Sequence, residues 1–152
     1  MSPDDSTVTF EDAPASLRRG ELRQFAAVLS ARVGGGRPFA CVLTSDAEMR
    51  RLNRDFLKHN YATDVLSFPS GERAGSLGDI AISIERAREQ ARQFGHSLAS
   101  EVRVLMLHGI LHLRGFDHES DNGRMQRAEA RWRREFGLPL GLIDRAKSGD
   151  GP

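Results

Sequence analysis

Apolar residues recur along the chain with two different periods, and the shorter period predicts strands. Apolar and polar residues alternate at residues 7–11 and 77–84, which is the pattern of strands with one buried face. A continuous apolar run at residues 38–43 predicts a strand buried on both faces, and Val65, Leu66 and Phe68 predict a further short strand. We therefore expect a small sheet of about four strands.

The longer period is that of helices, and it occurs in five segments. The second segment opens at Ser45, and we expect Met49, Leu52 and Phe56 to line its buried side. The other four segments are residues 17–33, residues 83–95 with Ser83 as the cap, residues 97–113 with Ser97 as the cap, and a last segment from about Ser120 to Phe136.

The segment that ends at Leu113 is apolar on almost every side, so we expect it to lie at the centre of the fold. The prediction is a single α/β domain over residues 7–145, in which a mixed sheet packs with about five helices around this central helix. Residues 1–6 are expected to be flexible and residues 146–152 to be a disordered tail.

Three of the five histidines lie within a stretch of eleven residues, His108 to His118. His108 and His112 are four residues apart, which on a helix places their Cβ atoms on one face and about 5–6 Å apart. Gly115 can end such a helix in a left-handed turn, after which His118 can fold back. The pattern predicts three histidine ligands for one metal ion, with one coordination position left open, and makes the central helix the metal-binding helix.

Two other interpretations of the histidines agree less well with the sequence. A single histidine on an apolar helix is more often a core residue with a satisfied hydrogen bond, but three at this spacing favour metal binding. The spacing also matches zinc metalloproteases, whose motif carries a glutamate where this chain has Gly109. Because that glutamate is the general base of those enzymes, its absence disfavours peptide hydrolysis.

Composition sets limits that the motifs do not. A chain of 152 residues with 39% hydrophobic and 28% charged residues is typical of one globular domain. The net charge of +1 neither requires nor excludes a nucleic-acid partner. The single cysteine, Cys41, excludes an internal disulfide and predicts a small buried side chain and no disulfide-linked partner. Without a signal-peptide pattern or an apolar run of membrane length, the expected compartment is the cytoplasm.

Three blocks of sequence together resemble the YbeY family of bacterial zinc-dependent endoribonucleases. The first is the histidine stretch, with Gly109, Leu111, Leu113, Gly115 and Asp117 between and beside the ligands. The second is the segment 63–69, preceded by Leu52 and Asn53, and the third is the segment 78–83. The resemblance covers about residues 7–142.

The resemblance implies a function and a set of site residues. It implies Zn²⁺ bound by His108, His112 and His118, cleavage of single-stranded RNA, maturation of the 3′ end of 16S ribosomal RNA, ribosome quality control, and ribosomal RNA and the small ribosomal subunit as partners. A zinc ion on three neutral histidines suits phosphodiester cleavage because it is a Lewis acid and acidifies water. The attacking group is either hydroxide or the 2′-OH of the RNA.

The remaining site residues are predictions from position and chemistry. Many family members carry an arginine where this chain has Leu57, and Lys58, Arg54 or His59 could supply the missing positive charge. Arg54 and Arg114 are the predicted phosphate contacts. Asp117 is predicted either to accept a hydrogen bond from a metal-binding imidazole without binding the metal itself, or to be a turn residue.

Two alternatives stay open from the sequence. One is a metalloprotease-like hydrolase that takes its base from elsewhere. The other is a non-catalytic ribosome-assembly factor in which the metal is structural, an idea favoured by the missing arginine at Leu57 and disfavoured by the open coordination position.

Overall fold

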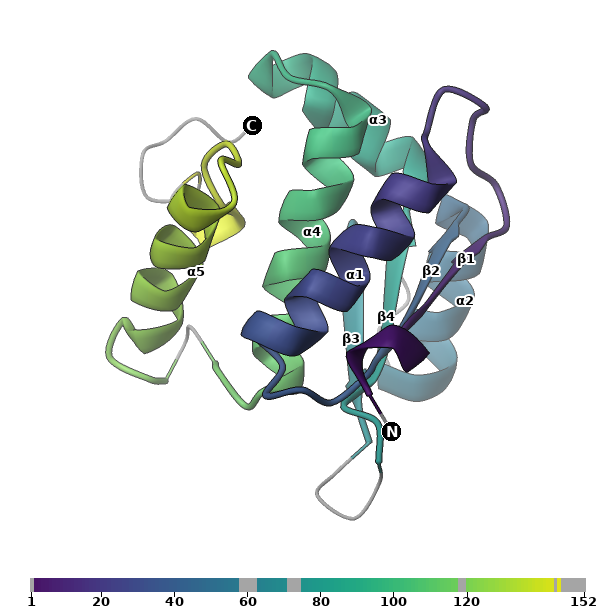
Figure 1. Cartoon of the computed structure of the whole chain (residues 1–152). Helices are drawn as coiled ribbons and strands as arrows, with labels where there is room; N and C mark the ends of the chain where they lie inside the picture. The colour runs from purple at the N-terminus through teal and green to yellow at the C-terminus, as the bar shows by residue number, and fades with distance from the viewer. Residues whose placement is uncertain (1, 58–62, 71–74, 118–119, 144, 146–152) are drawn as a thin grey trace.

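A four-stranded mixed sheet forms one layer of the protein (Figure 1). The computed structural model describes residues 2–57, 63–70, 75–117, 120–143 and 145. The strand order is β1-β2-β4-β3, with β1, β2 and β4 parallel and β3 antiparallel to β4 at the edge. The strands are β1 (Thr7–Phe10), β2 (Ala40–Thr44), β3 (Val65–Pro69) and β4 (Gly78–Ser83). The predicted α/β class and mixed sheet are therefore confirmed.

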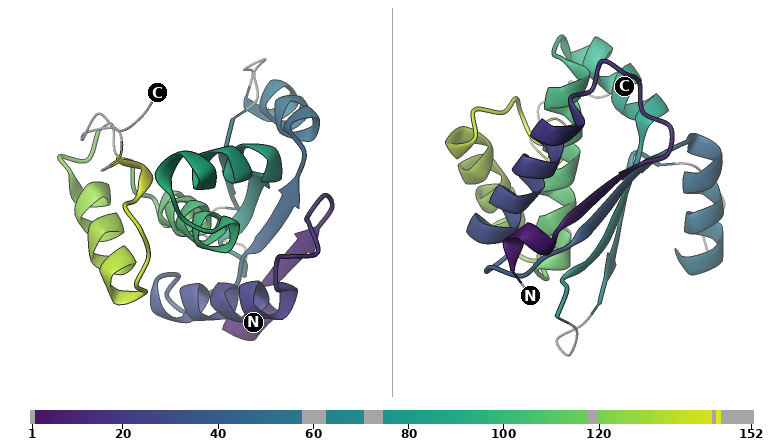
Figure 2. Two further views of the ribbon diagram at one scale, coloured as in Figure 1. Left: turned by 90° about the horizontal axis from the view of Figure 1, so that it is seen from above. Right: turned by 45° about the vertical axis from the view of Figure 1, so that its right-hand side comes forward.

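The described residues form five α-helices, of which α5 packs on α4 and not on the sheet. Helices α1 and α4 lie on one face and α2 lies alone on the other, as the two views in Figure 2 show. A short 3-10 helix, η1 (Pro3–Asp5), precedes β1. The helices are α1 (Arg19–Arg32), α2 (Asp46–Leu57), α3 (Ile84–Phe94), α4 (Leu98–Leu113) and α5 (Arg124–Glu135). No helix among those described combines the length and apolar composition that crossing a membrane would require.

Two details differ from the sequence prediction. Helix α5 begins at Arg124 and not near Ser120, because Asn122 and Gly123 adopt left-handed φ values of 57° and 82° that a helix cannot contain. Phe56 is 63% exposed, although it was expected to be buried beside Met49 and Leu52. Phe56 and Phe68 line an open groove of about 370 Å³ between α2 and the sheet, and their rings meet in a T-shaped arrangement with centroids 6.0 Å apart.

Helix α4 is the central element, as its all-round apolar sequence predicted. It packs against β3 and β4 on one side and against α1, α3 and α5 on the others. Gly109 lies where α4 packs tightly on β4: a Cβ atom there would stand 2.9 Å from two side-chain carbons of Ile80. The absence of a side chain at residue 109 therefore allows the helix to pack closely on the sheet.

Cys41 is buried in β2, as predicted. Burial raises the pKa of the Cys41 thiol to about 12, because the surrounding core does not solvate a thiolate. The thiol is therefore protonated and poorly nucleophilic at neutral pH.

The close approach at Gly109 can be tested with a double-mutant cycle. We expect Gly109→Ala to lower the free energy of unfolding by about 1–3 kcal/mol, because the added methyl overpacks against Ile80. Ile80→Ala removes the atoms that the methyl would meet, so the two changes should be less destabilising together than the sum of their separate effects. Urea unfolding gives the free energy of unfolding of the wild type, the two single variants and the double variant. Strict additivity of the two changes would contradict the contact between residue 109 and Ile80.

Cys41 predicts a specific loss of stability at alkaline pH. The folded state keeps the thiol protonated up to about pH 12, whereas the unfolded chain releases the proton near its ordinary pKa of 9.0. The contribution is thus complete below pH 9.0 and is lost as the pH rises toward about 12. Wild type should lose more unfolding free energy between about pH 8 and 10.5 than Cys41→Ala does. Equal losses in the two proteins would refute this.

Candidate metal site

Two histidines of α4 meet in its last two turns. His108 and His112 are one helical turn apart, and their Nε2 atoms lie 3.2 Å from each other. The two rings stand nearly perpendicular, at 73°, with centroids 4.8 Å apart. His108 is 7% exposed, whereas His112 is half-buried at the surface of the pocket. The sequence therefore placed these two imidazoles correctly on one face.

The histidine pair opens into a pocket of about 280 Å³ whose other wall is the edge strand β3. The strand contributes Val65, Leu66, Ser67 and Pro69 to this wall. The hydroxyl of Ser67 donates a hydrogen bond of 3.2 Å to the carbonyl oxygen of Gly109, one residue after His108. This bond joins the wall of the pocket to the helix that carries the histidines.

Glu129 contacts the ring nitrogen of His108 that does not face His112. One carboxylate oxygen of Glu129, Oε2, lies 2.6 Å from Nδ1 of His108. A carboxylate oxygen accepts hydrogen bonds, so the contact places the imidazole proton on Nδ1 and leaves the Nε2 lone pair directed toward His112. Metal-binding histidines usually make this kind of hydrogen bond through their second nitrogen.

Glu129 is not among the site residues predicted from the sequence, because it lies in a segment rich in charged residues. Its spacing carried a signal: Glu129 is four residues from Met125, and the two are 1% and 0% exposed. A carboxylate on the buried stripe of an otherwise charged helix needs a partner, since burying it alone is unfavourable.

The other predicted site residues are dispersed, or lie outside the described residues. Lys58 and His118 belong to the residues that the structure does not describe. Arg54 lies on α2, across the sheet from α4, and pairs with Asp55 at 3.1 Å. Arg114 follows α4, and its guanidinium packs close to Gly35 in the turn after α1. Their predicted contacts with RNA stay predictions.

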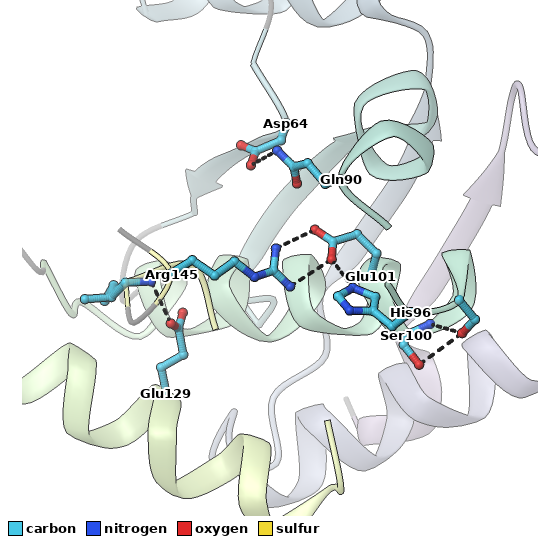
Figure 3. A network of polar contacts seen from close by, with 9 residues as sticks. Asp64, Gln90, His96, Ser100, Glu101, Glu129 and Arg145 are labelled. Carbon is cyan, nitrogen blue, oxygen red and sulfur yellow. Dashed lines mark hydrogen bonds and ion pairs between the residues drawn. The ribbon is translucent and has the colours of Figure 1, made fainter. Parts of the chain in front are cut away.

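Two aspartates near the site have identifiable structural contacts. Asp117 accepts a hydrogen bond of 3.0 Å from the hydroxyl of Ser120, which fits the turn role that the sequence left open. Asp64 joins the start of β3 to α3: its Oδ2 accepts from Gln90 at 3.1 Å (Figure 3), and its Oδ1 accepts from the backbone N–H of Val65 at 2.8 Å.

The described part of the site could hold a metal through two imidazole nitrogens. Within the described residues, no group of three or more His, Cys, Asp or Glu side chains is arranged to bind a metal. The third predicted ligand, His118, lies outside them. The arrangement provides two converging nitrogens, one carboxylate that orients the first of them, and an open pocket beside both.

Known proteins are similar to this chain over most of its length. The family described as Endoribonuclease YbeY matches residues 22–137, a range that contains His108, His112 and Glu129. The Endoribonuclease YbeY of Solibacter usitatus is 58% identical over 147 residues, which cover 97% of this chain and 99% of that relative. The protein of the same name from Nautilia profundicola is 49% identical over 105 residues, covering 68% of this chain and 76% of that relative.

A solved structure supports the same relationship. The solution structure of TM1509 from Thermotoga maritima superimposes with a TM-score of 0.59 at 26% sequence identity, covering 84% of this chain and 85% of the other. The match of the family to most of the chain and the near full-length relative agree with the resemblance in the three sequence blocks. The chain belongs to the YbeY endoribonuclease family.

Proposed function

We propose that this protein is a zinc-dependent endoribonuclease that processes ribosomal RNA. The observation that carries the proposal is the pair of Nε2 atoms 3.2 Å apart, with His108 held by Glu129, in a member of this family. By family membership, the proposed substrate is single-stranded 16S ribosomal RNA near its 3′ end, with the small ribosomal subunit as partner. A role in ribosome quality control and a cytoplasmic location belong to the same proposal.

The distance between the two nitrogens fits one tetrahedral zinc ion. Two Zn–N bonds of about 2.0–2.1 Å that meet at a tetrahedral angle hold their nitrogens about 3.3 Å apart. The observed separation of 3.2 Å is close to this value without any movement of the helix. We propose His118 as the third ligand, which would leave one position open to water or substrate.

The residues of the chain have separate tasks in this proposal. The bound ion would supply Lewis acidity toward a phosphoryl oxygen and would lower the pKa of water. Glu129 retains the proton on Nδ1 of His108 and so keeps Nε2 available as a ligand. Strand β3 forms the wall against which a nucleotide would lie, because Ser67 and Pro69 line the same pocket as the two histidines.

The pocket is less suited to the hydrolysis of peptides than to the cleavage of phosphodiesters. A metalloprotease of this spacing needs a glutamate at residue 109, and there the space beyond the Cα atom is filled by Ile80. A longer side chain at that position would have to displace the core between α4 and β4. The proposal therefore favours a phosphodiester substrate over a peptide.

Loss of one ligand should remove cleavage of RNA. We expect the zinc-loaded wild type to cut single-stranded RNA, and His112→Ala to cut it more than about 100-fold more slowly, because a lost ligand weakens the site more than a lost orienting residue does. Removal of zinc with a chelator should abolish cleavage by the wild type, and adding zinc back should restore it.

The same assay separates the rival functions. Both proteins are incubated with single-stranded RNA, structured RNA and casein, and cleavage is followed by gel electrophoresis. RNA cleavage that survives in His112→Ala would overturn the zinc-nuclease proposal. Zinc-dependent cleavage of casein would favour the protease, and binding of ribosomal RNA without cleavage of any substrate would favour the assembly factor.

If Arg54 and Arg114 contact phosphates, the affinity of the protein for RNA should depend on the salt concentration. Each contact that is lost should reduce the slope of log affinity against log salt concentration by about 1. We expect Arg54→Ala and Arg114→Ala each to bind RNA more weakly with a shallower slope. Arg88→Ala, which removes an exposed arginine of α3, is the matched control and should leave both quantities unchanged. Three identical slopes would contradict the two predicted contacts.

A further inference from the structure

The buried carboxylate of Glu129 faces two N–H donors at once. Its Oε2 is 2.6 Å from Nδ1 of His108, and its Oε1 accepts a hydrogen bond of 3.0 Å from the backbone N–H of Ile143. With a side chain that is 1% exposed, Glu129 is shielded from water. A carboxylate matches this environment because both of its oxygens accept, whereas an amide presents one acceptor and one donor.

The chain after α5 is shaped around this carboxylate. A Cβ atom at Gly141 would lie 2.1 Å from Oε1 of Glu129, 2.4 Å from its Cδ and 2.6 Å from its Cγ. The backbone at Gly141 therefore passes directly against the carboxylate, and any side chain at that position would occupy its space. The backbone at Gly141 and the N–H of Ile143 together form a slot, which fixes the position of the Glu129 carboxylate.

An ion pair fixes the segment that forms this slot. The guanidinium of Arg145 donates to both oxygens of Glu101 on α4, at 2.9 and 2.8 Å, and both residues are buried (Figure 3). The same guanidinium lies 4.4 Å from the centroid of the Phe94 ring at the end of α3. His96 contacts Glu101 at 2.6 Å. Because Glu101 and His108 lie on one helix, these contacts form a closed loop that begins and ends on α4.

We propose that Glu129 is the positioning residue of His108, and that the C-terminal segment containing Gly141, Ile143 and Arg145 holds Glu129 in place. Glu129 fixes the tautomer of His108 with the proton on Nδ1, which presents the Nε2 lone pair to the pocket. The importance of this for metal binding rests on the proposed function, in which His108 is a ligand. The tautomer itself can be observed in the metal-free protein.

Glu129→Gln is the sharpest test, since it keeps the size of the side chain. Its amide has one oxygen for two N–H donors. When that oxygen accepts from Ile143, the NH₂ group faces His108 and favours the tautomer that is protonated on Nε2. We expect the Nδ1–H form of His108, measured by ¹⁵N NMR of the metal-free protein at about pH 8, to dominate in the wild type and to lose population in the variant. Zinc affinity, measured by competition with a chelator, should fall about 10–100-fold.

Glu135→Gln is the matched control on the same helix, where the carboxylate pairs with Arg32 at the surface. It should leave the tautomer of His108 and the zinc affinity unchanged. A purely structural role for Glu129 would lower the unfolding free energy of Glu129→Gln while leaving the His108 tautomer as in the wild type. That outcome, or a zinc affinity within about twofold of the wild type, would overturn the proposal.

Gly141→Ala tests the slot without changing the carboxylate. The new methyl group would displace Glu129, so this variant should lose zinc affinity in the same direction and shift the same NMR signals. Gly20→Ala is its control, because a Cβ atom there meets nothing within 4 Å. Equal zinc affinity for both alanine variants would refute the role of the slot. If the wild type binds no zinc, the proposed function fails, and the tautomer data still decide whether Glu129 positions His108.

Discussion

The packing of α4 against the sheet is the constraint on which the site depends. This helix is enclosed by β3, β4 and three other helices, so it cannot shift without disturbing most of the core. Gly109 permits a close approach to Ile80, and its carbonyl oxygen also accepts a hydrogen bond from the hydroxyl of Ser67 on the edge strand. The residues before and after Gly109 on the helix therefore have fixed directions. His108 and His112 inherit a geometry set by the core.

The second constraint is electrostatic. An imidazole can direct either nitrogen toward a metal, and the pocket alone does not choose between them. The choice falls to a carboxylate that reaches His108 from α5 and is itself held by the segment that follows that helix. The buried ion pair between Arg145 and Glu101 ties this segment back to α4. In this way α4, α5 and the segment that follows α5 all bear on the orientation of one ring.

Much of this arrangement could be predicted from the sequence, and the failures have physical reasons. The periods of two and 3.6 residues predicted the sheet and the five helices, because each element buries one face or, for α4, all faces. The pairing of His108 with His112 followed from helical spacing alone. Glu129 was missed since its partner is 21 residues away, and local spacing does not reveal contacts between helices. The burial of Phe56 was predicted wrongly because the helical period shows on which side of α2 a residue lies. It does not show whether the sheet extends far enough to cover that residue. The start of α5 was predicted too early because Asn122 and Gly123 are left-handed. The pattern of polar residues does not distinguish them from polar residues within a helix.

We propose above all that His108 and His112 share one metal ion through their Nε2 atoms. X-ray absorption at the zinc edge of the zinc-loaded protein tests this most directly, because it reports the number, type and distance of the ligand atoms. The account predicts a four-coordinate ion with imidazole nitrogens at about 2.0–2.1 Å and the multiple-scattering pattern of histidine rings. It also predicts the loss of one imidazole from this pattern in His112→Ala. A shell of oxygen ligands alone, or a spectrum that is unchanged in that variant, would contradict the claim.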